Sequence, residues 1–276
     1  MARFGSRADQ AIRPNRNDFC SSRSFLVTDN QKMNPTKSST TRVRPVFGWL
    51  RENGGANWPD RLLEIVIGFL LPIKAGKLLR IELVPERKVA ASPTRLAWMI
   101  DNVSSLAPQD GRLWQERRNR IPDKQKIKGV LDRLGRGDPS GLDKKLRLEG
   151  ETCADCLLEC EHALVWIEGK RFDWISLSTK WDLSRDQLAR NLEAVWILAT
   201  TAKKDYCVVI CHEHPLKHHE QALINGYRNC IWTAGWPHIP AAQRIEFSKR
   251  IGTVTWQQIA ATWAELRSLP ELHDLA

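Results

Sequence analysis

The stretch CADCLLECEHALVWIEGKRFD, residues 153–173, decides how the chain folds. Its apolar run HALVWIEGK, residues 162–170, has the length and continuity of a strand that is buried on both faces. The preceding residues 153–160 alternate roughly as a strand does, and a turn around Glu161–Ala163 separates the two segments. We therefore expect an antiparallel hairpin that brings the polar side chains near residues 155 and 168 to the same end.

The flanking sequence predicts an α/β fold, with a mixed central sheet flanked by helices. From residue 144 the expected elements are strands 144–150, 153–160 and 162–170, helix 184–204, strand 205–214 and helix 215–229. Residues 43–143 are predicted to form a mainly helical N-terminal region that includes a short strand at 78–87. Residues 1–42 are rich in Arg, Asn, Ser and Thr without a sustained period, which is typical of a disordered basic tail. The predicted domains are therefore 1–42, 43–143 and 144–276.

The charge of the chain favours a polyanionic partner. The formal net charge is +10, and residues 1–50 and 111–150 each carry six more basic than acidic side chains. Such an excess suits nucleic acid, with DNA as our expectation, although a solvated surface with a basic tail has the same composition. The expected phosphate contacts lie on the helical run 112–134, at Arg117, Arg118, Arg120, Lys124, Lys126 and Lys128.

The sequence predicts a cytoplasmic protein that does not enter the membrane. Its longest apolar run, residues 62–73, is too short to span a bilayer and contains Glu64. The N-terminus has no apolar signal core, and seven cysteines in no disulfide-like spacing favour a reducing compartment. The oligomeric state stays open.

Two acids and a lysine form the first candidate site. Glu168 and Lys170 are two residues apart, so they project from one face of a strand, and the hairpin places Asp155 beside them. Mg²⁺, or Mn²⁺ in its place, prefers hard oxygen ligands, which Asp155, Glu168 and the backbone carbonyl of Gly169 would supply. Such an ion activates water and neutralises a phosphate, while Lys170 would orient the attacking water. This combination suits the hydrolysis of phosphodiester bonds.

Asp155 and the following Glu168-Gly169-Lys170 resemble the PD-(D/E)xK, or restriction-endonuclease-like, nuclease superfamily. The resemblance covers about residues 144–214 and implies a β-β-β-α-β core, metal binding by the acids and catalysis assisted by the lysine. It also implies a glutamine at the start of the next helix, where Gln187 stands, although Gln187 could equally complete a capping box with Ser184. Ala154 replaces the proline of the motif. The family's upstream acid has four candidates: Glu64, Asp101, Glu116 and Asp132.

The same stretch also allows a zinc site. Cys153, Cys156, Cys160 and His162 are soft-metal ligands, with further candidates at Cys211, His212, His214, His218 and His219. An extended strand would separate Cys156 and His162 by about 20 Å, at ~3.3 Å per residue, which is too far for one ion. We therefore expect the cysteines to be small buried apolar side chains.

The sequence thus predicts a metal-dependent nuclease with catalytic residues Asp155, Glu168, Lys170 and Gln187. Two alternatives stay open: a non-catalytic nucleic-acid-binding protein on the same scaffold, and a zinc-stabilised interaction module.

Overall fold

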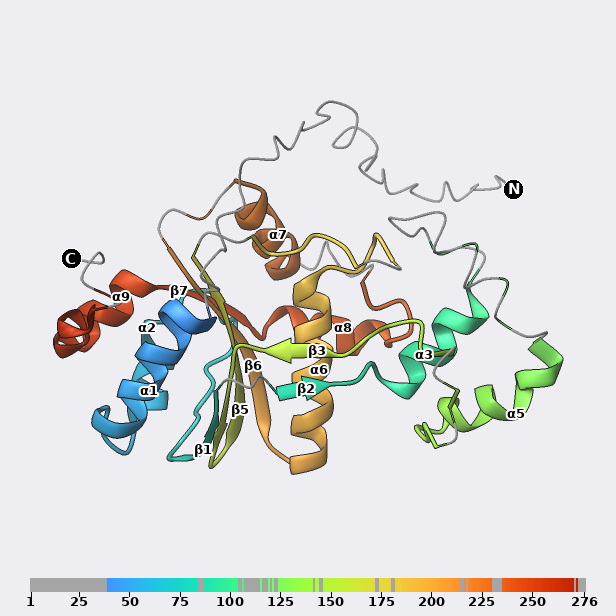
Figure 1. Cartoon of the computed structure of the whole chain (residues 1–276), viewed down its shortest axis with the longest axis horizontal. Helices are drawn as coiled ribbons and strands as arrows, with labels where there is room; N and C mark the ends of the chain where they lie inside the picture. Colours follow the sequence, from blue (N-terminus) through green and yellow to red (C-terminus); the bar gives the residue numbers. More distant parts are fainter. Residues whose placement is uncertain are drawn as a thin grey trace, which may run out of the picture. The chain divides into compact units, whose positions relative to one another are not determined.

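The centre of the chain, in a computed structural model, is a five-stranded mixed sheet of order β1-β4-β5-β6-β7 (Figure 1). Its strands are Leu78–Glu82 (β1), Cys156–Cys160 (β4), Ala163–Lys170 (β5), Asp205–His212 (β6) and Ile251–Thr255 (β7). The first three pair antiparallel, and β5, β6 and β7 run parallel. The predicted α/β class, with helices flanking a mixed sheet, is confirmed.

The structure describes residues 39–83, 87–103, 106, 115, 119, 121, 124–140, 142–143, 146–171, 174–179, 182–213, 216, 218–229, 235–270 and 272. Residues Thr36–Ala276 form one compact unit. Strand β1 of the sheet lies in the region that was predicted to be mainly helical. A second unit, Met1–Pro35, lies outside the described residues, as does most of the predicted tail. Within the described residues, none of the helices has the length and apolar character that crossing a bilayer needs.

Helices cover both faces of the sheet because the strand side chains alternate between two apolar clusters. Val165 and Ile167 of β5 belong to one cluster, and Leu164 and Trp166 of the same strand belong to the other. The first is covered by the helices Arg44–Asn53 (α1), Trp58–Ile65 (α2) and Trp256–Thr262 (α9). The second is covered by Gln187–Ala202 (α6), His218–Arg228 (α7) and Ala241–Ser248 (α8), which lie on the other side in Figure 1. A strand in the middle of this sandwich is buried on both faces.

A third cluster of apolar side chains lies in the residues between β1 and β4. It is formed by helices Pro93–Asp101 (α3) and Lys124–Gly135 (α5), whose packing includes Leu146 and Leu148. A small second sheet, Arg87–Val89 (β2) paired with Thr152–Ala154 (β3), joins this part to α6.

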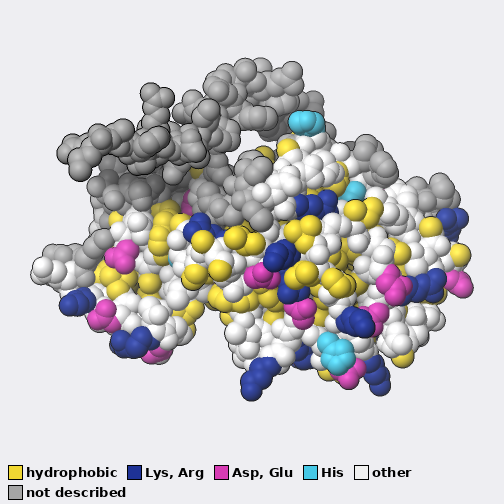
Figure 2. Space-filling model, turned by 180° about the vertical axis from the view of Figure 1, so that it is seen from behind, with side chains coloured by type: hydrophobic (Ala, Val, Ile, Leu, Met, Phe, Trp, Pro, Cys, Tyr) yellow, Lys and Arg dark blue, Asp and Glu magenta, His cyan; other side chains and the backbone are white. Residues whose placement is uncertain are grey.

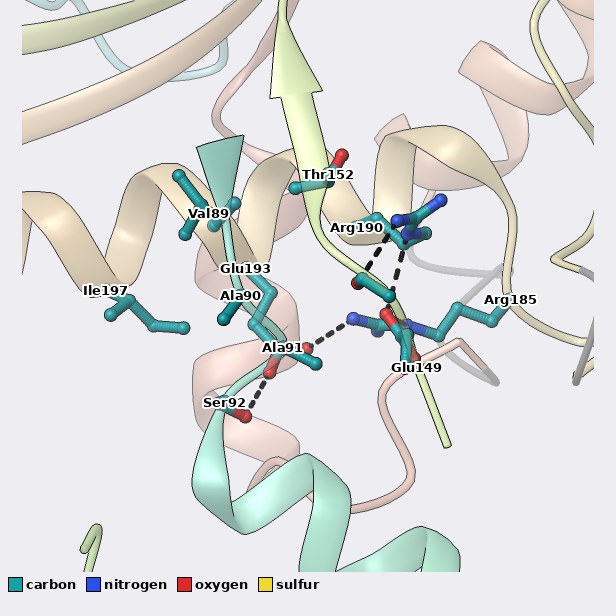
Figure 3. Close-up of a pocket in the computed structure, with 12 residues that line it drawn as sticks. Val89, Ala90, Ala91, Ser92, Glu149, Thr152, Arg185, Arg190, Glu193 and Ile197 are labelled. Carbon is teal, nitrogen blue, oxygen red and sulfur yellow. Dashed lines mark hydrogen bonds and ion pairs between the residues drawn. The ribbon is translucent and has the colours of Figure 1, made fainter. Parts of the chain in front are cut away.

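Buried ion pairs hold this third part against α6. Glu149 accepts from Arg95 at 3.0 Å and from Arg185 at 2.8 Å, and Arg185 also pairs with Glu193 of α6 at 2.9 Å. Figure 3 shows Glu149, Arg185 and Glu193 turned toward one another, with Ser92 donating to Glu193. The pocket that they line has a volume of about 10 Å³, which suits about one water molecule. The arrangement therefore joins two parts of the fold and leaves no room for a metabolite.

The predicted strand 144–150 is wrong. Its described residues, 146–150, form no strand, because Leu146 and Leu148 pack into the α3–α5 cluster while Glu149 points to the arginines. The strand that pairs with β4 is instead β1, from far earlier in the chain. The predicted hairpin of β4 and β5 is confirmed, with Cys156 opposite Ile167 and Glu159 opposite Leu164.

Candidate active site

Glu168 and Lys170 lie near the end of β5, on the face that α6 covers. The side-chain alternation of Leu164 and Trp166 continues through both residues, which are only 3% and 6% exposed. Burial of a charge is costly unless the charge is paired, and Lys170 Nζ is 2.9 Å from Glu168 Oε1. The structure therefore brings together the two charged residues of the sequence motif as a buried ion pair.

Helix α6 supplies two amides to the same carboxylate. Gln187 Nε2 donates to Glu168 Oε1 at 2.7 Å, and Asn191 Nδ2 donates to Glu168 Oε2 at 2.9 Å. The two amides are four residues apart, so they share one face of the helix. Asn191 is fully buried, and its Oδ1 accepts from the hydroxyl of Thr152 in β3 at 3.1 Å. Both oxygens of Glu168 are thus held by side chains of β5 and α6, and Thr152 of β3 in turn holds Asn191.

Gln187 is the first residue of α6, and it does not complete the capping box that the sequence allowed with Ser184. The N-cap is Asp186, whose carboxylate accepts from the backbone N–H of Ala189 at 2.9 Å. The side chain of Gln187 is therefore available to Glu168. Of the two roles considered for Gln187, the contact with the candidate site is the one that its geometry favours.

Asp155 lies in a bend that divides the predicted strand 153–160 into β3 and β4. It precedes the paired residues Cys156 and Ile167, so it stands opposite Glu168 across the two strands. Its Oδ2 accepts from the backbone N–H of Gly169 at 2.8 Å. The hairpin thus places Asp155 beside the Glu168-Gly169-Lys170 segment, and its side chain remains half-buried.

Position 169 has room only for a glycine, because the side chain of Val43 packs directly against it. A Cβ at this position would be 2.3 Å from Val43 Cγ2 and 3.6 Å from Asp155 Oδ2. Val43 is the last residue of the π-helical turn Ser39–Val43 (η2), which precedes α1. Its side chain is fully buried. The middle position of the motif is therefore a point of close packing between β5 and the start of α1.

A third acid, Glu213, follows β6 at the same edge of the sheet. Its backbone N–H donates to the carbonyl of Lys170 at 3.2 Å. Its carboxylate accepts from Arg42 Nε at 3.0 Å and lies 3.6 Å from Arg171 Nε. Two guanidinium groups therefore neutralise Glu213, which makes it a poorer metal ligand than Asp155.

The carboxylates of Asp155 and Glu168 could hold a hard cation that keeps much of its water. Magnesium is often held by one or two carboxylates, and Asp155 and Glu168 supply two. A carboxylate accepts about four bonds, so the three donors to Glu168 leave one position for a ligand. In the part of the chain that the structure describes, no three residues of the His, Cys, Asp and Glu types gather closely enough to hold a metal ion.

Of the four candidates for the upstream acid, the three that the structure describes do not complete this pair. Glu64 is exposed at the end of α2, and Asp101 and Asp132 are exposed on α3 and α5. Glu116 lies outside the described residues. Since none of the three described acids forms a metal-holding group with Asp155 and Glu168, the predicted third acid has no counterpart among them.

The zinc alternative is not supported by the cysteines that the structure describes. Cys156, Cys160 and Cys211 are fully buried in the apolar cluster under α1, whereas His162 is 61% exposed. Burial raises the pKa of the Cys156 thiol well above its usual range and that of Cys160 to about 12, so neither readily becomes a thiolate ligand. Cys153 is half-buried in β3, His212 Nδ1 donates to the carbonyl of Glu213, and His218 is exposed. The expectation that the cysteines are buried apolar side chains is confirmed for Cys156, Cys160, Cys207 and Cys211. The side chains of His214 and His219 lie outside the described set.

The predicted basic run is only partly described. Lys128 is exposed on α5, whereas Arg117, Arg118 and Arg120 and the side chains of Lys124 and Lys126 lie outside the described set. On the face shown in Figure 2, the described Lys and Arg side chains are interspersed with Asp and Glu. The charge excess is therefore not gathered into one basic field on that face of the described residues.

Sequence reasoning missed Asn191, Thr152 and Glu213. The spacing of Gln187 and Asn191 on one helical face is a usable signal, because Gln187 had been placed near the site. Thr152 and Glu213 carry no such signal, since their roles depend on where β3 and β6 end.

Comparison of the chain with models of protein families, with characterised proteins and with solved structures finds no match. The case for an activity therefore rests on the residues around Glu168.

Proposed function

We propose that the chain is a metal-dependent nuclease that hydrolyses phosphodiester bonds in DNA. The order of its central elements supports this proposal. Strands β1, β4 and β5 pair antiparallel, α6 follows, and β6 pairs parallel with β5. This order is compatible with the β-β-β-α-β core that the resemblance to PD-(D/E)xK nucleases implies, with β1 in place of the predicted strand 144–150 and a long insertion between β1 and β4.

The observation that carries the proposal is the gathering of four motif residues at one end of β5. Glu168, Lys170 and Gln187 are in direct contact, and Asp155 is bonded to the amide of the residue between Glu168 and Lys170. Residues 13 to 32 positions from Asp155 thus converge on one small region. A solvated surface pair would need neither the burial nor the two amides from α6.

Each side chain has a role that follows from its contacts. A Mg²⁺ or Mn²⁺ ion held by Asp155 and Glu168, with the carbonyl of Gly169, would lower the pKa of a bound water and neutralise phosphate charge. Lys170 carries the positive charge that would orient the attacking water and stabilise the phosphorane-like transition state. Gln187 and Asn191 hold Glu168 in one orientation. Water adds to phosphorus and releases a proton to solvent, while the bond to the leaving oxygen breaks and that oxygen takes up a proton from solvent.

A cleavage assay tests the proposal. Purified protein is incubated with end-labelled single- and double-stranded DNA in Mg²⁺ or Mn²⁺, and Glu168→Ala and Lys170→Ala are compared with the wild type. We expect each variant to cleave at least about 100-fold more slowly, as when a group that stabilises the transition state is removed. Equal activity in all proteins, or cleavage by none, contradicts the proposal.

A matched pair of variants controls for damage to the fold. Glu159 and Lys204 form another acid–lysine pair beside the same sheet, at 3.0 Å, away from the end of β5. Glu159→Ala and Lys204→Ala should therefore leave cleavage within about twofold of the wild type, since partly exposed ion pairs contribute little to stability.

A non-catalytic nucleic-acid-binding protein on the same scaffold is the second candidate. The observation that favours it is the engagement of both Glu168 oxygens, together with the missing third acid among the described residues. DNA binding that weakens as salt rises, without cleavage in either metal, would support this candidate over the nuclease.

A further inference from the structure

The connection between β5 and α6 carries exposed apolar side chains next to the candidate site. It runs from Lys170 to Gln187, and its described residues include Trp174, Leu177 and Leu183, which are 54%, 50% and 42% exposed. Tryptophan is the largest side chain and is more often kept from water. The described part of this connection therefore exposes three large apolar side chains, of which Trp174 is the largest.

The backbone around Trp174 is fixed by three hydrogen bonds. The next residue, Ile175, is 1% exposed, and its N–H donates to Glu220 Oε1 at 3.0 Å. Ser176 exchanges two bonds with Gln187: its carbonyl accepts from the Gln187 N–H at 2.9 Å, and its own N–H donates to Gln187 Oε1 at 3.3 Å. The segment that presents the indole is thus ordered before any ligand arrives.

These bonds also place Trp174 near the candidate site. Gln187 contacts Glu168 at 2.7 Å, and Trp174 is two residues from the Ser176 carbonyl that Gln187 binds. Two residues span at most about 8 Å, so the backbone of Trp174 lies within roughly 10 Å of the start of α6. At ~3.4 Å per stacked nucleotide, this distance corresponds to about three nucleotides.

We propose that Trp174 stacks on a nucleobase of an unpaired DNA strand whose backbone passes the candidate site. The proposal rests on the proposed function and adds the form of the substrate. An indole offers a flat apolar face on which the unpaired bases of such a strand can stack. In a duplex the faces of the bases are covered by stacking, so the ring can reach a base in a single strand or a frayed end.

A binding measurement in EDTA tests the proposal without metal-dependent cleavage. Fluorescence anisotropy is recorded with a labelled 12-nucleotide oligo(dT), and with a labelled abasic strand that has the same phosphates and no bases. We expect Trp174→Ala to weaken binding of oligo(dT) by about 5- to 140-fold, the effect of losing one base–aromatic stack. The abasic strand should bind the variant and the wild type equally, and Trp174→Phe should retain most of the affinity for oligo(dT).

A remote variant controls for loss of an exposed apolar side chain. Leu79 of β1 is 57% exposed, and Leu79→Ala should bind both strands as the wild type does. The proposal is overturned if Trp174→Ala binds oligo(dT) as tightly as the wild type, or if it loses the same factor on both strands.

The nuclease activity and the stacking contact of Trp174 are tested by different outcomes. Cleavage with no effect of Trp174→Ala on oligo(dT) binding removes the stacking contact and keeps the nuclease. A base-dependent effect of Trp174→Ala without cleavage supports the contact and favours the binding protein. A wild type that binds neither strand overturns the stacking proposal together with nucleic acid as the partner.

Discussion

Substitution of Gly169 by alanine tests the close contact at the centre of the candidate site. The added Cβ would lie 2.3 Å from Val43 Cγ2, whereas carbon atoms in contact are normally about 3.5–4.0 Å apart. The Val43 side chain or one of the two backbones must therefore move by more than about 1 Å. Overpacking of this kind costs about 1–3 kcal/mol, and the smaller entropy of the unfolded alanine chain offsets up to about 1 kcal/mol. We expect Gly169→Ala to lose about 1–2 kcal/mol of unfolding free energy.

A double-mutant cycle assigns this loss to Val43. Val43→Ala alone removes two buried carbons and should cost about 1.6 kcal/mol, at ~0.8 kcal/mol for each. In the double variant the new Cβ occupies the space that the valine methyl leaves. The loss of the double variant should therefore be smaller than the sum of the two single losses by about 1–2 kcal/mol.

Urea unfolding followed by tryptophan fluorescence and circular dichroism measures the four free energies, and thermal unfolding should show Gly169→Ala melting about 2–8 °C lower. Gly48 of α1 is the control, because nothing lies within 4 Å of its hypothetical Cβ. Gly48→Ala should stabilise the protein by about 0.5–1 kcal/mol, as expected inside a helix. The reasoning is refuted if Gly169→Ala matches the wild type, or if the losses of the two single variants simply add.

Three further predictions concern buried polar groups. Asn191→Ala should cost about 1.5–3 kcal/mol in urea unfolding, because the buried carboxylate of Glu168 loses a donor; a loss under about 0.5 kcal/mol would contradict this. Burial raises the pKa of Asp186 to about 6, so the folded state favours its protonated form, and stability falls as the pH rises from about 4 to above 6. Asp186→Asn lacks this titration, and its stability relative to the wild type should rise by about 3 kcal/mol between pH 4 and pH 8; a constant difference would refute the assignment. A zinc-selective chelator should leave the melting temperature unchanged, since Cys156 and Cys160 lie in the apolar core, and a fall in that temperature would restore the zinc alternative.

Local patterns predicted the part of the fold that is built from neighbouring residues. The hairpin of β4 and β5 follows from an apolar run beside a turn, and the position of Asp155 relative to Glu168 follows from the lengths of its two strands. Gln187 was considered because the resemblance implies a glutamine at the start of the helix that follows the motif strand, and that start was visible in the local sequence. These features need no knowledge of how distant segments pack.

The errors have a common physical cause, which is packing between segments that are distant in sequence. Apolar and polar residues alternate at 144–150 as they do in a strand, but Leu146 and Leu148 pack into the cluster formed by α3 and α5. The partner of β4 is β1, and nothing in either segment encodes that pairing. The contact of Asn191 with Glu168 likewise depends on how α6 lies on β5.

The interruption between β1 and β4 has a consequence for synthesis on the ribosome. The 73 residues 83–155 separate the two strands, so β1 emerges long before its partner exists. At a synthesis rate of about 5–20 residues per second, the backbone hydrogen-bonding groups of β1 stay unpaired for roughly 4–15 s until β4 is made. An open edge of this kind can pair with another nascent chain. Translation speed across the insertion therefore sets how long the newborn protein is exposed to misassembly.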